Sequence, residues 1–203
     1  MQVGTPNTQT LRNYSKLVGA KGSVVLIEAN EDSCTVLQQY KKTKCLANVS
    51  IVAKGCWSEK STLTFRKSSE YDGDHRFDVE DVFVDNDLRT NLDDVEQVEV
   101  DTLDRILKKL NISKVNYLCI TVNGAELEVL KGSDSTLTNS DDIRVFSKGH
   151  ARIGAADSDQ SLNKYIQQFL NTYQYTAVLS KGEESPTGKD VWGQRSGDVF
   201  AWK

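Results

Sequence analysis

Long apolar runs are absent from this sequence of 203 residues, and their absence excludes several classes of protein. No stretch approaches the roughly 20 consecutive apolar residues that a membrane-spanning helix needs. The amino terminus has neither the basic region nor the apolar region of a secretory signal peptide. Lys and Arg number 25 against 29 Asp and Glu, a net charge of −4, so no excess of positive charge attracts nucleic acid or an anionic membrane. We therefore expect a cytoplasmic protein that binds neither.

Cysteine and histidine are also scarce, with four and two residues respectively. The cysteines, Cys34, Cys45, Cys56 and Cys119, form no C-x-x-C pair, and no histidine stands at metal-ligand spacing from them. This pattern predicts no metal site. In a cytoplasmic chain the four side chains are expected to be reduced thiols, most of them buried.

What the sequence does contain is an alternation of helical and extended patterns over most of its length. The predicted elements are strands over 23–29, 48–53, 63–65, 115–122 and 143–146, and helices around 11–18, 32–42, 103–110 and 162–173. Two extended segments, 175–179 and 199–202, close the chain. This order predicts an α/β fold with a doubly wound, mostly parallel sheet and an antiparallel carboxyl-terminal hairpin. With no repeat or linker, we expect a single domain over 1–203.

Between residues 67 and 99 the periodic pattern disappears and acidic and polar residues dominate. Such a stretch is typical of an exposed insertion. It is expected to be either a solvated loop or a lid over a binding site.

The segment 115–132 has the pattern of a buried strand, a glycine turn and a helix. Its apolar residues suit a strand covered on both faces, and Gly124 lets the backbone turn sharply into the helix. In an open parallel sheet, ligands bind at the carboxyl ends of the strands. Thr121 and Asn123, at that end, are therefore expected to face the ligand.

Four segments, in this order and at this spacing, resemble one known family. They are 22–30 (GSVVLIEAN), 48–58 (NVSIVAKGCWS), 100–107 (VDTLDRIL) and 115–132 (VNYLCITVNGAELEVLKG). Over residues 2–150 the chain resembles the FkbM family of S-adenosylmethionine-dependent methyltransferases. The resemblance implies a Rossmann-like class I methyltransferase sheet, S-adenosylmethionine as cofactor, and methyl transfer that is usually to oxygen.

Cofactor contacts are expected at the strand ends. A carboxylate at Glu28, which closes the second strand, can accept hydrogen bonds from both ribose hydroxyls, and it follows Gly4 by 24 positions (28 − 4 = 24), near the usual interval. The alternative is a surface glutamate at a strand end. Ala29 adjoins Glu28, and the resemblance places the adenine near Gly55, Cys56 and Trp57. The indole of Trp57 would either stack on the base or fill the core.

The sequence departs from the family pattern at two places. The family's first strand ends in an acidic residue and a glycine-rich turn, but here Gln2 stands in place of the acid, Thr8 replaces the second glycine, and Gly4 remains. Two further family acids are replaced by Thr121 and Asn123. Three explanations stay open: a divergent active enzyme, a degenerate relative with another role, or a first strand lost by truncation.

Few residues precede Gly4, so the first strand, which the family places in the middle of the sheet, is expected to be short or truncated. Its neighbours would then have unpaired backbone groups. Either the first segment is poorly ordered, or a second copy of the chain covers the exposed surface in a homodimer.

Methyl transfer to a hydroxyl benefits from a base with a pKa near neutrality, which histidine supplies. His150, near the end of the 143–146 strand, is the candidate, with Thr121 and Asn123 as the other catalytic candidates; His75 lies in the acidic segment. The alternative for His150 is a structural histidine.

The sequence thus predicts an S-adenosylmethionine-dependent methyltransferase that methylates a hydroxyl of a small molecule or a glycan. One alternative is a catalytically degenerate Rossmann-like module that serves in interaction or scaffolding. An NAD-binding protein is less favoured, because Gly4 lacks the two companion glycines of that motif.

Overall fold

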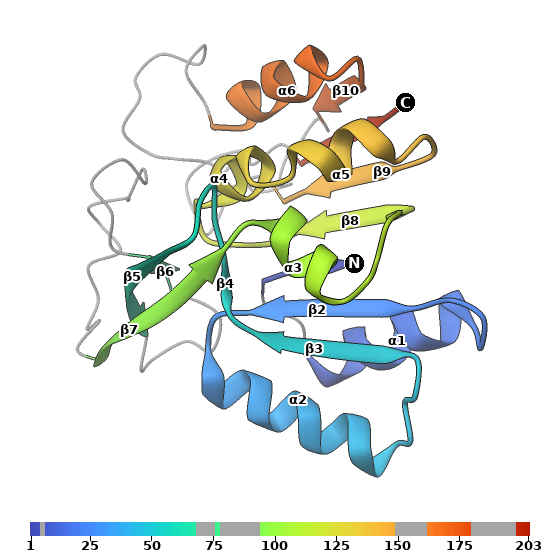
Figure 1. The fold of residues 1–203 in the computed structure, drawn as a ribbon, viewed down its shortest axis with the longest axis vertical. Coiled ribbons are helices and arrows are strands. Elements are labelled where there is room, and N and C mark those ends of the chain that lie inside the picture. The colour runs from blue at the N-terminus through green and yellow to red at the C-terminus, as the bar shows by residue number, and fades with distance from the viewer. Residues whose placement is uncertain (5–6, 68–75, 78–93, 149–161, 180–197) are drawn as a thin grey trace, which may run out of the picture.

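The computed structural model describes residues 1–4, 7–67, 76–77, 94–148, 162–179 and 198–203. At its centre is a seven-stranded sheet in the order β10-β11-β9-β8-β1-β2-β3. These strands are β10 (Thr176–Leu179), β11 (Val199–Trp202), β9 (Arg144–Ser147), β8 (Tyr117–Ile120), β1 (Gln2–Val3), β2 (Val24–Glu28) and β3 (Val49–Ala53). Pairing from β9 to β3 is parallel, whereas β11 is antiparallel to both β9 and β10 (Figure 1). The predicted α/β sheet with its carboxyl-terminal hairpin is confirmed.

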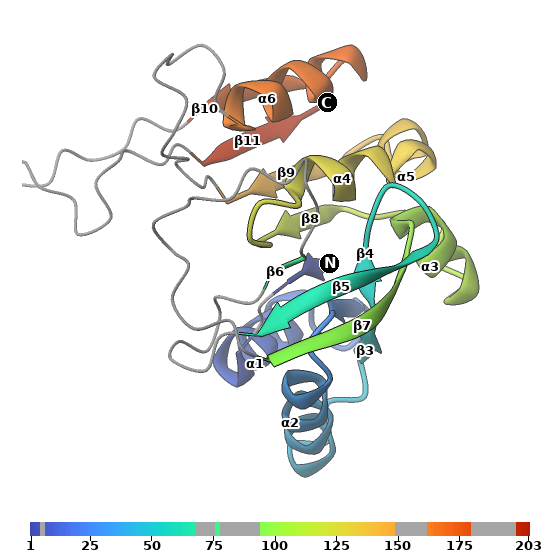
Figure 2. The ribbon, with the colours of Figure 1, turned by 90° about the vertical axis from the view of Figure 1, so that its left-hand side faces the viewer.

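Helices cover the two faces of this sheet, which Figure 2 shows end-on. They are α1 (Thr8–Val18) and α2 (Glu31–Thr43) on one face, and α3 (Leu103–Lys109), α4 (Glu126–Lys131), α5 (Asp134–Asn139) and α6 (Leu162–Thr172) on the other. Successive residues of a strand point to opposite faces. Leu26 of β2 accordingly packs with Leu11 and Leu37, while Ile27 belongs to the larger core that includes Ile166 of α6.

Local capping explains where three of these helices begin. The Asn7 side chain accepts the Thr10 N–H at 2.8 Å, and the Asn30 side chain accepts N–H groups of the first turn of α2. Thr102 caps α3 by accepting the Arg105 N–H at 3.2 Å, as its position predicts. Each such cap contributes about 1 kcal/mol to helix stability.

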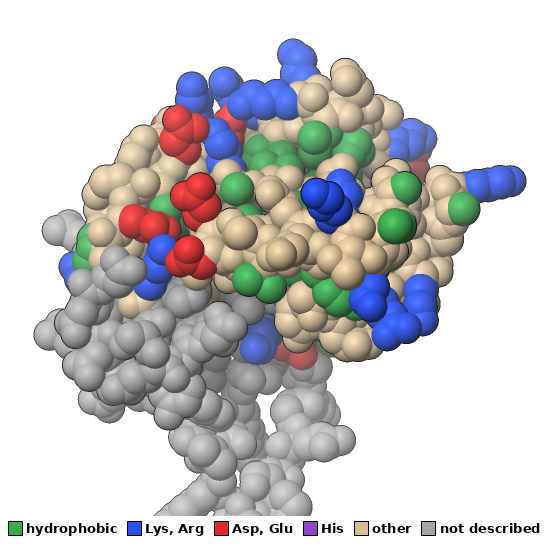
Figure 3. Space-filling view, turned by 90° about the horizontal axis from the view of Figure 1, so that it is seen from below, with side chains coloured by type: hydrophobic (Ala, Val, Ile, Leu, Met, Phe, Trp, Pro, Cys, Tyr) green, Lys and Arg blue, Asp and Glu red, His purple; other side chains and the backbone are tan. Residues whose placement is uncertain are grey.

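Charge is separated along α2. Glu31 and Asp32 lie in its first turn, and Lys41 and Lys42 lie in its last turn, which suits the helix dipole. Seen from below in Figure 3, most acidic side chains lie on the left, toward the carboxyl ends of the strands, and a group of basic side chains lies at the opposite end. Basic side chains stand beside the acidic ones there, and Lys67 pairs with Asp32 of α2 at 3.1 Å.

The central strand β1 is only two residues long, yet its backbone is paired on both sides. Beyond the strand, the Gly4 N–H donates to the Ile27 carbonyl and the Thr121 N–H donates to the Val3 carbonyl, both at 2.9 Å. The expected short strand is present, but within residues 1–4 the unpaired neighbours that we expected are not found. The gap that a second copy would have to fill is thus closed by β1 itself.

A smaller sheet, in the order β4-β7-β5-β6, stands at the carboxyl edge of the main sheet (Figures 1 and 2). Its strands are β4 (Gly55–Cys56), β7 (Asp94–Asp101), β5 (Ser61–Lys67) and β6 (Arg76–Phe77). Strands therefore occur at 76–77 and 94–99, within the segment 67–99 in which the sequence showed no periodic pattern. Residues 68–75 and 78–93 of that segment lie outside the described residues.

The missed strand β7 has a physical explanation. Val98 and Val100 point into the core of the smaller sheet, and the intervening Glu99 is exposed, so the segment alternates with the period of a strand. Acidic residues are depleted in strands, and their density here hid that period.

Candidate functional site

Parallel pairing brings the carboxyl ends of β1, β2 and β8 to one edge of the main sheet, beside the smaller sheet (Figure 2). Glu28 is the last residue of β2, and Gly4 and Thr121 directly follow β1 and β8. The structure thus brings together three residues that the sequence pattern marked as a site. Asn123 lies two residues farther, in the turn before α4.

Gly4 is held in a conformation that requires glycine. Its φ is +81°, in the left-handed region that a residue with a Cβ rarely adopts. A Cβ would also overlap the carbonyl oxygen of Thr121 and lie 2.6 Å from Val122 Cγ1. Gly4 therefore lets the chain after β1 pass directly against the chain after β8.

The Glu28 carboxylate is buried at the carboxyl edge, with only 7% of the residue exposed. Its Oε1 accepts the backbone N–H of Asn30 at 2.8 Å, which fixes the side chain at the start of α2. The Cys34 thiol donates to the Glu28 carbonyl at 3.4 Å. Burial, and next the charge of Glu28, raise the pKa of Cys34 to about 12, so this thiol stays protonated. Glu28 is thus an oriented buried carboxylate and not a surface glutamate.

A neutral hydrogen-bond network joins β1, β8 and α1 at this edge. Gln2 Nε2 donates to Thr121 Oγ1 at 2.5 Å and to the Gly4 carbonyl at 2.9 Å. Thr121 Oγ1 donates to the same carbonyl at 3.1 Å, and the Tyr14 hydroxyl donates to Gln2 Oε1 at 3.2 Å. Gln2 and Thr121, two of the three residues that replace family acids, are therefore direct partners of each other.

Tyr14 was missed as a site residue. The sequence pattern showed it only as one member of the apolar stripe of α1, and nothing local reveals that its hydroxyl reaches Gln2. Burial raises the pKa of Tyr14 above its usual range, so the phenol remains a hydrogen-bond donor at neutral pH.

Trp57 lies in the core of the smaller sheet, with 9% of the residue exposed. Its ring packs edge-on against Phe77 at 5.5 Å between centroids, in a cluster that includes Phe65 and Ala125. Ala29 packs against the same cluster. This geometry supports the core role of Trp57, with Ala29 joining the cluster to the end of β2.

Gly55 and Cys56 form β4 and are buried. A Cβ at Gly55 would lie 2.6 Å from both Phe77 Cζ and Val100 Cγ1, so close packing requires the glycine. The Cys56 side chain belongs to the main core, and burial raises the pKa of its thiol. Both residues follow the carboxyl end of β3, where Ala53 pairs with Glu28.

Asp101, at the end of β7, anchors the smaller sheet to α3. Its fully buried carboxylate accepts Lys109 Nζ at 2.7 Å, Arg105 Nε at 2.8 Å and the Thr102 N–H at 3.1 Å. Burial alone would raise the pKa of Asp101, but these three donors outweigh it and lower the pKa. The Trp57 N–H donates to the Asp101 carbonyl at 3.0 Å, which fixes β4 as well.

The two histidines, His75 and His150, lie outside the described residues, so the structure does not place the predicted base. Across the described ranges, no three His, Cys, Asp or Glu side chains gather as a metal-binding group.

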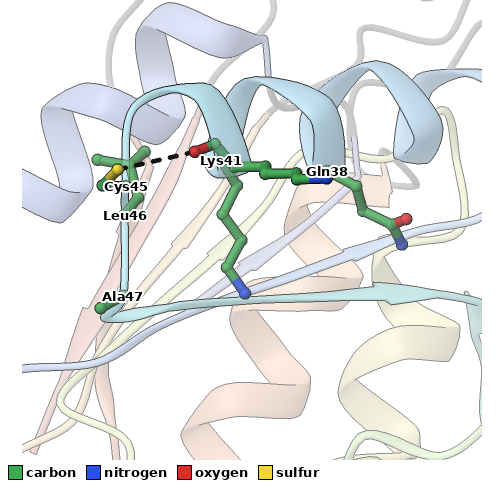
Figure 4. Close-up of a pocket in the computed structure, with 6 residues that line it drawn as sticks. Gln38, Lys41, Cys45, Leu46 and Ala47 are labelled. Atoms are coloured by element: carbon green, nitrogen blue, oxygen red, sulfur yellow. Dashed lines mark hydrogen bonds between the residues drawn. The ribbon is translucent and has the colours of Figure 1, made fainter.

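A hollow elsewhere on the surface is formed by residues of the last turns of α2 and the turn into β3 (Figure 4). Its lining comprises Gln38, Lys41, Lys42, Cys45, Leu46 and Ala47. Because these residues precede β3, the hollow lies at the amino edge of the main sheet, opposite Glu28 and Gly4. It contains none of the predicted site residues.

One protein-family model matches most of this chain, including the residues at the carboxyl edge. A model described as the methyltransferase FkbM domain matches residues 2–176, which is most of the chain. The chain belongs to the FkbM methyltransferase family. The family inferred from the four sequence segments is confirmed.

Solved structures share the fold at low sequence identity. The FkbM methyltransferase of Methylobacillus flagellatus matches with a TM-score of 0.56 and 14% identity, over 100% of this chain and 43% of that chain. The O-methyltransferase of Bacillus cereus, solved with S-adenosylhomocysteine, matches with a TM-score of 0.51 and 11% identity, over 99% of this chain and 71% of that chain. The O-methyltransferase TomG of Streptomyces achromogenes, solved with S-adenosylmethionine, matches with a TM-score of 0.50 and 10% identity, over 99% of this chain and 70% of that chain.

This chain therefore spans less than half the length of the Methylobacillus structure. No curated protein matches the chain. Within the part of the chain that the structure describes, every helix is too short or too polar for a membrane crossing.

Proposed function

We propose that this chain binds S-adenosylmethionine at the carboxyl edge of the main sheet and methylates a hydroxyl of a small molecule or a glycan. The observation that carries the proposal is the buried, oriented Glu28 carboxylate at the end of β2, beside the left-handed turn at Gly4. The FkbM family membership and the likeness to structures solved with S-adenosylmethionine or S-adenosylhomocysteine support it.

The residues at this edge fit the proposed ligand. The Glu28 carboxylate can accept bonds from the ribose hydroxyls, and the missing Cβ at Gly4 permits close backbone approach. Near Glu28, Ala29 and the cluster around Trp57 supply an apolar wall suited to the adenine.

S-adenosylmethionine supplies an electrophilic methyl group carried on a positively charged sulfur. When bound, it would supply this methyl group to the acceptor oxygen and leave as S-adenosylhomocysteine, and the hydroxyl proton would pass to a base. We assign that base to His150 and the positioning of the acceptor to Thr121 and Asn123. Alignment and exclusion of water supply much of the rate enhancement in such a reaction.

Calorimetric titration with S-adenosylhomocysteine tests the cofactor site. Glu28→Ala removes a charged partner of the ribose, worth roughly 1.5 to 3 kcal/mol, and should raise the Kd about ten- to a hundredfold. The matched control is Glu31→Ala, which removes an exposed carboxylate three positions away and should leave the Kd unchanged. Equal binding by Glu28→Ala and its parent would remove Glu28 from the site.

The second candidate function is a non-catalytic interaction or scaffold module, and the neutral Gln2–Thr121 pair favours it. Where the family has acids, this chain has two groups that satisfy each other. Thr121→Asp distinguishes the two functions, because a carboxylate can still accept the Gln2 Nε2 hydrogen bond. In a divergent methyltransferase, the variant should bind the sulfonium cofactor more tightly than the parent does. Unchanged or absent binding by both proteins would favour the scaffold module.

A cytoplasmic location and a homodimer are further parts of the proposal. Exposed aromatic side chains of β8 and β11, namely Tyr117, Phe200 and Trp202, each 42% exposed, are the surface that a dimer would cover. Light scattering over a concentration series measures the assembly, and a constant monomer mass would refute the homodimer.

A further inference from the structure

The carboxylate of Glu28, on which the proposed cofactor site depends, is held by a residue two positions farther along the chain. The backbone N–H of Asn30 donates to Glu28 Oε1 at 2.8 Å. Both residues are buried, with 7% of Glu28 and 4% of Asn30 exposed. Hydrogen bonds from a backbone N–H to a carboxylate are about twice as strong as neutral ones. This bond therefore defines the direction in which the carboxylate points.

The side chain of Asn30 fixes the position of that N–H. Asn30 stands between β2 and α2 (Figure 1), with a φ of −74° and a ψ of 113°, the extended conformation of a helix-capping residue. Its Oδ1 accepts the Asp32 N–H at 2.9 Å and the Ser33 N–H at 3.3 Å. Its carbonyl accepts the Cys34 N–H at 3.0 Å. These three bonds hold the Asn30 backbone at the start of α2, and its N–H then points back to the end of β2.

The rest of this junction is anchored without the cap. The Glu28 carbonyl accepts the Lys54 N–H at 2.9 Å and the Cys34 thiol at 3.4 Å. Farther along α2, Leu37 packs in a core cluster that includes Val24 of β2. Loss of the Asn30 side chain should therefore loosen the first turn of α2 and the N–H on Glu28, while the body of the helix and the end of the strand stay in place.

A carboxylate without this hold would be less suited to binding. Glutamate has several rotatable bonds, and a flexible side chain that becomes ordered only when a ligand binds reduces the affinity. A carboxylate that is already oriented in the free protein avoids this cost. The bond from Asn30 supplies that orientation at Glu28.

We propose that Asn30 is a positioning residue for the cofactor: by capping α2, its side chain keeps the Glu28 carboxylate in the orientation that receives the ribose hydroxyls of S-adenosylmethionine. The Asn30 side chain acts through Glu28 and not by a contact of its own with the cofactor. This assignment rests on the proposed methyltransferase function. It adds to that function a residue whose effect on binding depends on Glu28.

The test is a double-mutant cycle in the whole chain, with the Kd for S-adenosylhomocysteine and the urea midpoint of unfolding measured for each protein. The cycle comprises Asn30→Ala, Glu28→Ala and the double variant. Asn30→Ser keeps an oxygen acceptor for the cap and serves as the rescue variant. Thr102→Ala is the matched control, because Thr102 caps α3, on the opposite face of the sheet, by accepting the Arg105 N–H at 3.2 Å.

The expected result separates positioning from stability. Asn30→Ala should raise the Kd about three- to tenfold, the range for ordering one flexible side chain on binding, and Asn30→Ser should stay within about twofold of the parent. The double variant should bind no more weakly than Glu28→Ala, because the two residues act as one unit. Asn30→Ala and Thr102→Ala should both lower the urea midpoint, but Thr102→Ala should leave the Kd unchanged. The proposal is overturned if Asn30→Ala binds as the parent does, if Asn30→Ser fails to restore binding, if the double variant binds more weakly than Glu28→Ala, or if Thr102→Ala raises the Kd equally.

Failure of the proposed function gives a different result. If the parent does not bind S-adenosylhomocysteine, or if Glu28→Ala binds it as the parent does, the cofactor role of Glu28 is refuted, and the role of Asn30 for the cofactor falls with it. Hydrogen exchange at the amide of position 30 distinguishes this case from failure of the positioning itself, because it needs no ligand. The protection of that amide should fall at least about tenfold in Asn30→Ala and be retained in Asn30→Ser. Equal protection in the parent and Asn30→Ala would overturn the positioning role even in a protein that binds the cofactor.

Discussion

Replacement of Gly4 by alanine should destabilise the protein through two separable effects. The first is backbone strain, because alanine at a φ of +81° costs roughly 1 to 2 kcal/mol. The second is overlap of the new Cβ with the Thr121 carbonyl and with Val122, for which overpacking costs of about 1 to 3 kcal/mol are typical. The expected total is therefore about 2 to 5 kcal/mol. For a chain of 203 residues, each kcal/mol lowers Tm by about 2 to 4 °C.

Gly19→Ala is the matched control for this measurement. Gly19 also has a positive φ, of +67°, but nothing lies within 4 Å of its Cβ position, so the variant carries strain without overlap. Urea unfolding of both variants should show Gly4→Ala to be the less stable by at least about 1 kcal/mol. Gly4→Ala should also weaken binding of S-adenosylhomocysteine, because the displaced turn borders Glu28. Equal stability of the two variants would refute the close approach of Gly4 to β8.

Two further predictions concern Asp101 and the cysteines. Asp101→Asn should cost roughly 1.5 to 3 kcal/mol at pH 7 through weakened bonds to Lys109 and Arg105. Because folding lowers the pKa of Asp101, this stabilisation is complete above the unfolded pKa of about 3.9 and is lost as pH falls through the folded pKa. The urea midpoints of parent and variant should therefore converge below pH 4, and a constant difference from pH 7 to pH 3 would contradict the assignment. A thiol reagent should label Cys45 alone in the native chain, because Cys34, Cys56 and Cys119 are buried, and burial raises the pKa of all three. Rapid native labelling of a second thiol would show that one of these three sites opens.

The main sheet could be predicted because its signals are local. A run of apolar residues predicts β2, the helical spacing of apolar residues after Asn30 predicts α2, and Thr102 marks the start of α3. Helix α5 gave no such signal, since its first N–H groups bond to a side chain of another helix. The Asp104 carboxylate accepts the Ser135 N–H at 2.7 Å and the Thr136 N–H at 2.9 Å. A cap supplied across the fold leaves no pattern in the neighbouring sequence.

The part of the candidate site that follows from local sequence signals could also be predicted. Glu28 and Thr121 follow recognisable strands, and a parallel sheet brings the ends of its strands to one edge. The bond between Gln2 and Thr121 could not be predicted, because it joins residues 119 positions apart.

The shortness of β1 has a consequence for the order of folding. Among the strands that the structure describes, the two-residue β1 alone connects by backbone pairing the half-sheet of β2 and β3 to the half-sheet of β8, β9, β11 and β10. Its contacts with β2 close a short loop, whereas its contacts with β8 close a loop of more than a hundred residues, which costs more entropy and slows folding. The two halves can therefore form early and separately, and the edge that carries Gly4, Glu28 and Thr121 is completed when they join. Hydrogen exchange at the Gly4 and Thr121 amides would report on this last step.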